Sequence, residues 1–97
     1  MLRDTVRILK DLVAFDTTSH LSNLQLIHYI DAYLDSFGVK SKLVLNAEGN
    51  KANLIATIGP NVPGGVVLSG HTDVVPVEGQ DWATDPFHVV ENGTRLY

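Results

Sequence analysis

The chain has 97 residues, 44% of them apolar and 19% charged, which is the composition of one small globular domain. Seven lysines and arginines against eleven aspartates and glutamates give a net charge of −4, without the basic cluster that nucleic acids or anionic lipids require. The absence of cysteine excludes disulfides and thiolate metal sites, and no apolar run approaches the ~20 residues that span a bilayer. We therefore expect a cytoplasmic protein with no nucleic-acid or membrane partner.

The chain is predicted to begin with an amphipathic helix over residues 3–15. Val6, Leu9 and Val13 recur at intervals of three and four residues, which places them on one face of a helix. The following stretch, residues 16–23, is rich in threonine, serine and asparagine. Their side chains compete for backbone hydrogen bonds, so this stretch is predicted to form a loop.

A second helix is predicted to follow this loop. Ser22 and Gln25 have the spacing of a capping box, which would begin the helix. Leu26, Ile30 and Leu34 then form one apolar stripe, and Gly38 is suited to the left-handed conformation that often ends a helix.

Three strands are predicted after the helices, over residues 39–45, 53–58 and 66–69. The last of these is apolar on both faces, as in a central strand covered by helices. The fold class is therefore α/β, with two helices followed by the strands of a mixed sheet. Residues 95–97 are interpreted as the opening of another strand without a closing turn, so we expect the chain to be part of a longer domain.

The residues that indicate chemistry follow the third predicted strand. His71 and Asp73 are two positions apart, so their side chains point the same way in an extended backbone. Ligands of open α/β sheets bind beyond the carboxyl ends of strands. Neutral histidine is the commonest metal ligand, and a carboxylate typically orients its second ring nitrogen. We therefore consider His71 as a metal ligand and Asp73 as its orienting carboxylate, although a surface histidine beside a turn fits the same pattern.

Other polar and aromatic residues are interpreted without a catalytic role. The remaining histidines are expected at the surface: His20, His28 and His88. Apolar anchors for the segment after the histidine motif are expected at Trp82, Pro86 and Phe87. Neither a serine-hydrolase motif nor a phosphate-binding loop is present.

Several motifs in this chain resemble the dimetal zinc exopeptidase and aminoacylase family. Ser-Gly-His-Thr-Asp-Val-Val-Pro-Val at 69–77 carries most of the resemblance, together with shorter matches at 12–17, 51–60, 80–82, 85–87 and 95–97. The resemblance implies a zinc-exopeptidase-like catalytic domain of which residues 1–97 form the N-terminal segment. The rest of that domain and a dimerisation domain would lie outside this sequence.

The resemblance also implies roles for the two motif residues. His71 would bind one of two catalytic ions, zinc or possibly cobalt, and Asp73 would act as a catalytic residue by orienting His71. The complete enzyme, expected to be a homodimer, would hydrolyse the amide of a small N-acyl amino acid. Within the family the resemblance favours a deacetylase over a desuccinylase or peptidase. The alternative is a catalytically silent folding or binding unit, because the other ligands and the general base of the family are not found in these 97 residues.

Overall fold

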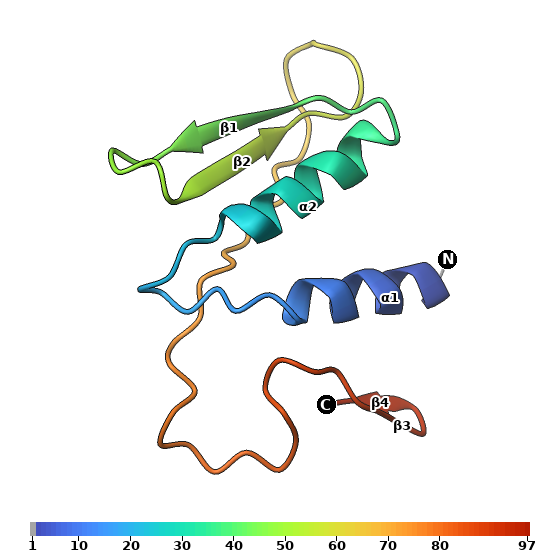
Figure 1. The fold of residues 1–97 in the computed structure, drawn as a ribbon. Helices are drawn as coiled ribbons and strands as arrows, with labels where there is room; N and C mark the ends of the chain where they lie inside the picture. The colour runs from blue at the N-terminus through green and yellow to red at the C-terminus, as the bar shows by residue number, and fades with distance from the viewer. Residues whose placement is uncertain (1) are drawn as a thin grey trace.

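The computed structural model describes residues 2–97 and arranges them as two helices and two small antiparallel sheets (Figure 1). The helices are α1, Leu2–Val13, and α2, Leu24–Asp35. The first sheet pairs β1, Ser41–Leu45, with β2, Ala52–Ala56. The second pairs β3, Glu91–Asn92, with β4, Arg95–Leu96. Two helices followed by strands confirm an α/β chain, although both sheets are antiparallel hairpins.

The beginning of α2 differs from the predicted capping box. Asn23 is the residue that precedes the helix, and the Ser22 hydroxyl accepts a 3.2 Å hydrogen bond from the backbone N–H of Leu24 and donates to the carbonyl of Asn50. The Asn23 side chain instead bonds to Ala52, donating to its carbonyl and accepting from its N–H, each at 2.9 Å. An amide side chain can pair with a backbone in this way, so Asn23 fastens the start of α2 to β2.

The other end of α2 is as predicted. Gly38 adopts the left-handed conformation, with φ of 74°, and the N–H of Val39 donates a 3.0 Å hydrogen bond to the carbonyl of Leu34. A side chain at this backbone conformation would be strained, which explains the use of glycine.

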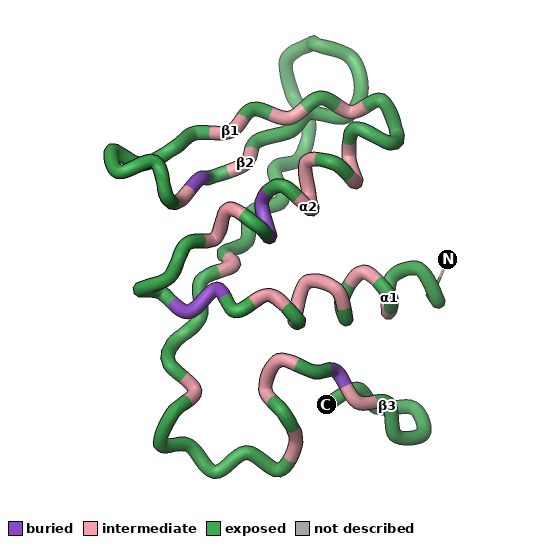
Figure 2. Tube along the Cα trace, viewed as in Figure 1, coloured by how far each residue is buried: buried purple, intermediate pink, exposed green. Residues whose placement is uncertain are grey.

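The hydrophobic core lies where α2 packs against β2. Leu26, Ile27 and Ala52 are each only 4% exposed, and Figure 2 shows the buried positions of α2 and β2. Partly buried apolar residues from both helices, from β1 and β2 and from the loop after α1 pack against them. This core is small. The radius of gyration of the Cα atoms is 15.7 Å, above the roughly 13 Å of a compact domain of about 100 residues. The described chain is thus an open arrangement around a few buried side chains.

The predicted central strand at residues 66–69 is not formed. Val66, Val67 and Leu68 are 87%, 90% and 93% exposed, and no backbone of residues 2–97 pairs with theirs. Apolar composition favours a central strand only where neighbouring strands and covering helices are available, and this part of the chain has none beside it. The predicted strand at residues 66–69 is therefore wrong, because a central strand depends on neighbouring segments that the local sequence does not specify.

Strands β3 and β4 form a hairpin that was not predicted from the sequence. Arg95 pairs with Asn92, and Gly93 takes the turn with φ of 61°. The predicted strand at residues 95–97 is confirmed for Arg95 and Leu96, whereas its pairing with β3 through the preceding turn was not predicted. An ion pair of 2.6 Å between Lys10 and Glu91 links this hairpin to α1. Neither helix of the described chain has the length and apolar character that crossing a membrane demands.

Candidate active site

His71 and Asp73 lie side by side, as their spacing predicted. The Nδ1 atom of His71 is 2.9 Å from Oδ1 of Asp73 and 3.0 Å from the backbone oxygen of Asp73. Since both partners are acceptors, a neutral imidazole carries its proton on Nδ1 here and donates it. The Nε2 atom then keeps its lone pair and has no hydrogen-bond partner within residues 2–97. The two side chains are 84% and 66% exposed, so this nitrogen is accessible.

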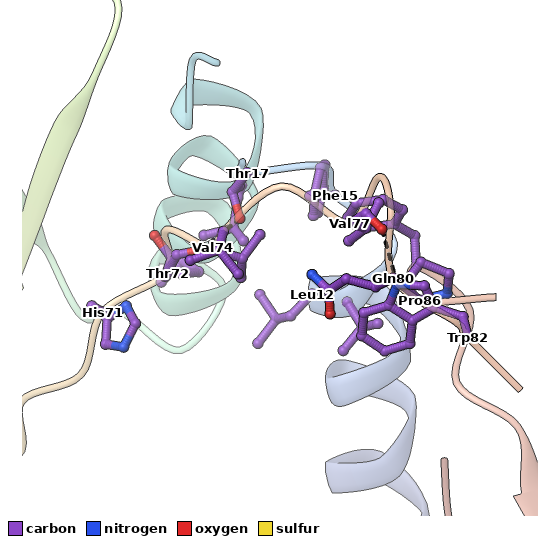
Figure 3. Close-up of a pocket in the computed structure, with 15 residues that line it drawn as sticks. Leu12, Phe15, Thr17, His71, Thr72, Val74, Val77, Gln80, Trp82 and Pro86 are labelled. Atoms are coloured by element: carbon purple, nitrogen blue, oxygen red, sulfur yellow. Dashed lines mark hydrogen bonds between the residues drawn. The ribbon is translucent and has the colours of Figure 1, made fainter. Parts of the chain in front are cut away.

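The backbone of the motif is held by the loop that follows α1. The N–H of Val74 donates to the carbonyl of Thr17 at 3.2 Å, and Ser19 donates its N–H to the carbonyl of Val74 at 2.9 Å. Thr18 and Val74 thus form an isolated parallel bridge. In addition, the Thr17 hydroxyl donates a 2.5 Å hydrogen bond to the carbonyl oxygen of Thr72 (Figure 3). These bonds fix the backbone next to the His71–Asp73 pair.

The loop itself is organised by Asp16. Its Oδ1 atom accepts hydrogen bonds from the N–H of Thr18 at 3.1 Å and from the Thr18 hydroxyl. These bonds favour the ionised carboxylate and therefore lower the pKa of Asp16 from its ordinary value of 3.8. A loop was predicted here, but the burial of Thr17 and Thr18, which are 5% and 4% exposed, was not. The signal was available in part, because aspartate two residues before threonine is typical of such a turn.

The described residues supply one candidate metal ligand and the group that orients it. No set of three or more histidine, aspartate or glutamate side chains in the described residues is arranged to hold a metal ion. A catalytic zinc ion takes three protein ligands and a water molecule. His71 supplies an accessible Nε2 atom, and Asp73 supplies the carboxylate that typically accompanies a ligating histidine. The other histidines are exposed, as predicted: His20, His28 and His88.

A cavity of about 420 Å³ extends from the motif along α1 and α2. Figure 3 shows His71 at one end of this cavity and Trp82 with Pro86 at the other. The Trp82 indole donates a 3.2 Å hydrogen bond to the carbonyl of Val77 but remains 49% exposed. All three predicted apolar anchors line this cavity. Pro86 and Phe87 are half-buried, whereas Trp82 is exposed. A second hollow, between β2 and residues 69–73, is about 740 Å³ and also reaches His71.

Comparison with known proteins places the chain among the relatives of deacetylases and desuccinylases. It is 38% identical over 85 residues to the acetylornithine deacetylase of Photorhabdus laumondii, which covers 87% of this chain and 22% of that protein. The acetylornithine deacetylase of Edwardsiella ictaluri is 40% identical over 78 residues, covering 78% and 20%. A probable succinyl-diaminopimelate desuccinylase of Staphylococcus aureus is 31% identical over 96 residues, covering 98% and 23%.

The chain thus spans about a fifth of the length of the curated relatives it matches. No family model and no solved structure matches it. The resemblance indicated by the motifs is confirmed, since the chain is homologous to acetylornithine deacetylases and, at lower identity, to succinyl-diaminopimelate desuccinylases.

Proposed function

We propose that this chain contributes one metal ligand and its orienting carboxylate to the active site of a metal-dependent amidohydrolase. The ligand is His71 and the orienting group is Asp73. The observation that carries the proposal is the 2.9 Å contact between Nδ1 of His71 and Oδ1 of Asp73, which leaves Nε2 free. The proposal includes a zinc-exopeptidase-like catalytic domain with two zinc or cobalt ions and a homodimeric complete enzyme.

The geometry of the motif supports this assignment for physical reasons. A histidine ligates a metal through a nitrogen lone pair, so the proton must stay on the other ring nitrogen. Asp73 keeps the proton on Nδ1 by accepting it in a hydrogen bond, and its negative charge increases the basicity of the ring. Asp73 thereby orients the imidazole without binding the ion itself.

A bound zinc or cobalt ion would polarise an amide carbonyl and supply a nucleophile from water at neutral pH. Hydrolysis then breaks the C–N bond, with the acyl group leaving as a carboxylate and the amine taking up a proton. Within this chain, His71 would contribute a neutral donor atom and Asp73 would keep that atom aimed at the ion. The general base that moves the proton is not assigned to any residue of this chain.

We propose N2-acetyl-L-ornithine as the substrate, with L-ornithine and acetate as products. The relatives named acetylornithine deacetylase, at 37–40% identity, support this choice over the desuccinylase at 31%. The related alternative is removal of a succinyl group from a diamino acid by the same chemistry. Both reactions belong to one class, the hydrolysis of a small N-acyl amino acid.

The proposal can be tested in a chimera, in which this chain replaces the matching segment of the Photorhabdus laumondii acetylornithine deacetylase. The chimera should release acetate from N2-acetyl-L-ornithine when supplied with zinc or cobalt. His71→Ala should abolish turnover and lower the bound metal. Asp73→Asn should retain part of the metal and lose about 10- to 100-fold in activity, as changes to groups behind a metal ligand commonly do.

The matched control is His88→Ala, which removes an exposed histidine whose ring has no hydrogen-bond or ion-pair partner within residues 2–97. This variant of the chimera should keep its activity and metal content. An active chimera in which His71→Ala has no effect would contradict the metal-ligand assignment. Preferential turnover of a succinylated substrate would contradict the choice of acetylornithine.

A second candidate function is a catalytically silent folding or binding unit. It is favoured by one observation, that no metal-binding set of three side chains exists within residues 2–97. The 97-residue chain on its own should then bind zinc weakly in calorimetry and hydrolyse neither substrate. Hydrolysis of N2-acetyl-L-ornithine by the purified chain, abolished by His71→Ala, would contradict this candidate.

A further inference from the structure

Thr17 is a buried residue whose hydroxyl reaches the histidine motif from 55 positions away in the sequence. Its Oγ1 atom donates a 2.5 Å hydrogen bond to the carbonyl of Thr72, the residue between His71 and Asp73. The residue is 5% exposed, so water has little access to replace this bond. Figure 3 shows the side chain of Thr17 pointing toward the strip of chain formed by Thr72 and Val74.

Thr17 also contacts the backbone on the other side of Asp73. Its carbonyl accepts a 3.2 Å hydrogen bond from the N–H of Val74. One residue thus bonds to the chain immediately before and immediately after Asp73, which restricts both peptide planes that set the direction of its carboxylate. The His71 and Asp73 side chains are themselves 84% and 66% exposed. Packing therefore contributes little to holding them, and the backbone must do so.

We propose that Thr17 is a positioning residue for the His71–Asp73 pair. By fixing the Thr72 carbonyl, its hydroxyl keeps the Asp73 carboxylate and carbonyl facing Nδ1 of His71. The ring is then held in the tautomer that carries its proton on Nδ1. The inference rests on the proposed function in one respect, that the free Nε2 atom binds a metal ion. The tautomer itself can be measured without any metal ion.

The test uses the 97-residue chain labelled with nitrogen-15, at a pH of about 8 where imidazole is neutral. The chemical shifts of the two ring nitrogens of His71 report the ratio of the Nδ1–H to the Nε2–H tautomer. In the wild type the Nδ1–H form should predominate. Thr17→Val preserves shape and removes the hydroxyl. It should lower the ratio about fivefold, the change that loss of one typical hydrogen bond gives. Thr17→Ser, which keeps the hydroxyl, should retain the wild-type ratio.

Thr57→Val is the control because Thr57 is an exposed threonine outside the loop and the histidine motif. This variant should leave the His71 tautomer unchanged. An unchanged ratio in Thr17→Val, an equal loss in Thr17→Ser, or a wild type without a predominant Nδ1–H form would each overturn the inference.

A further readout requires no variant and remains decisive if Thr17→Val fails to fold. The Thr17 hydroxyl proton of the wild type should exchange slowly enough with water to give a resonance, with a nuclear Overhauser effect to the backbone around Thr72. Absence of that signal in the folded chain would overturn the inference. A His71 that binds no metal would contradict the proposed function while leaving the tautomer result intact, so the two failures are distinguishable.

Discussion

The phenolic hydroxyl of Tyr29 on α2 donates a hydrogen bond of 2.7 Å to Oδ2 of Asp11 on α1. The ring of Tyr29 also lies against Phe15, with ring centroids 5.7 Å apart. These two contacts connect α2 with α1 and with the residues that follow it, where the side chains are only partly buried. The hydrogen bond to Asp11 favours the protonated phenol and raises the pKa of Tyr29 above its ordinary value of 10.0.

Removal of this hydroxyl should destabilise the fold in a pH-dependent way. Tyr29→Phe is expected to lower the free energy of unfolding by about 0.5–1.5 kcal/mol at pH 8. Because the folded-state pKa is raised, the contribution is fully present below about pH 10 and disappears as the pH rises through the folded value. Urea unfolding of both proteins from pH 8 to 11 measures the difference. Tyr33→Phe is the control, since its ring packs against Phe37 and its hydroxyl has no partner in the described chain.

The small core should be sensitive to truncation. Leu26 is 4% exposed and packs with Ile27 and Ala52, so Leu26→Ala should lower the free energy of unfolding by about 2–5 kcal/mol. Leu2 is 78% exposed, and Leu2→Ala should stay within about 0.5 kcal/mol of the wild type. Equal losses in urea unfolding for both variants would contradict the position of the core.

The exposed apolar run at Val66, Val67 and Leu68 should promote self-association of the 97-residue chain. The unpaired backbone N–H and C=O groups of an exposed apolar segment are a template for pairing between molecules. Val67 is 90% exposed, so Val67→Lys should increase the monomer fraction in sedimentation velocity without lowering stability. Val67→Leu keeps the apolar character and should associate as the wild type does. A wild type that is monomeric at high concentration would argue against this prediction.

The pKa of Asp16 should show whether the loop after α1 is ordered. The Thr18 hydrogen bonds lower the folded-state pKa of Asp16, so their contribution to stability is present above about pH 4 and is lost as the pH falls through the folded value. Carbon-13 NMR should find the Asp16 carboxyl titrating below 3.8 in the wild type. Thr18→Val should move that midpoint upward. Thr57→Val, at an exposed threonine outside the loop, should not.

The elements that sequence reasoning predicted are those encoded within a few neighbouring residues. Helical periodicity identified α1 and α2, and alternation with a polar turn identified β1 and β2. The separation of two positions between His71 and Asp73 was enough to expect their contact, because an extended backbone carries such side chains on one side. Each of these signals is local, so no knowledge of the rest of the fold was needed.

Tertiary structure decided the features that depend on which distant segments meet. The side chain of Asn23 makes no capping hydrogen bond in its own helix because its amide pairs with Ala52 on β2. Residues 66–69 have strand composition, yet no strand forms where the described chain places no neighbour beside them. Thr17 is a polar loop residue by sequence, and only the approach of Thr72, 55 positions later, turns its hydroxyl into a buried contact. Local patterns fix dihedral preferences, whereas pairing partners are set by the packing of the whole chain.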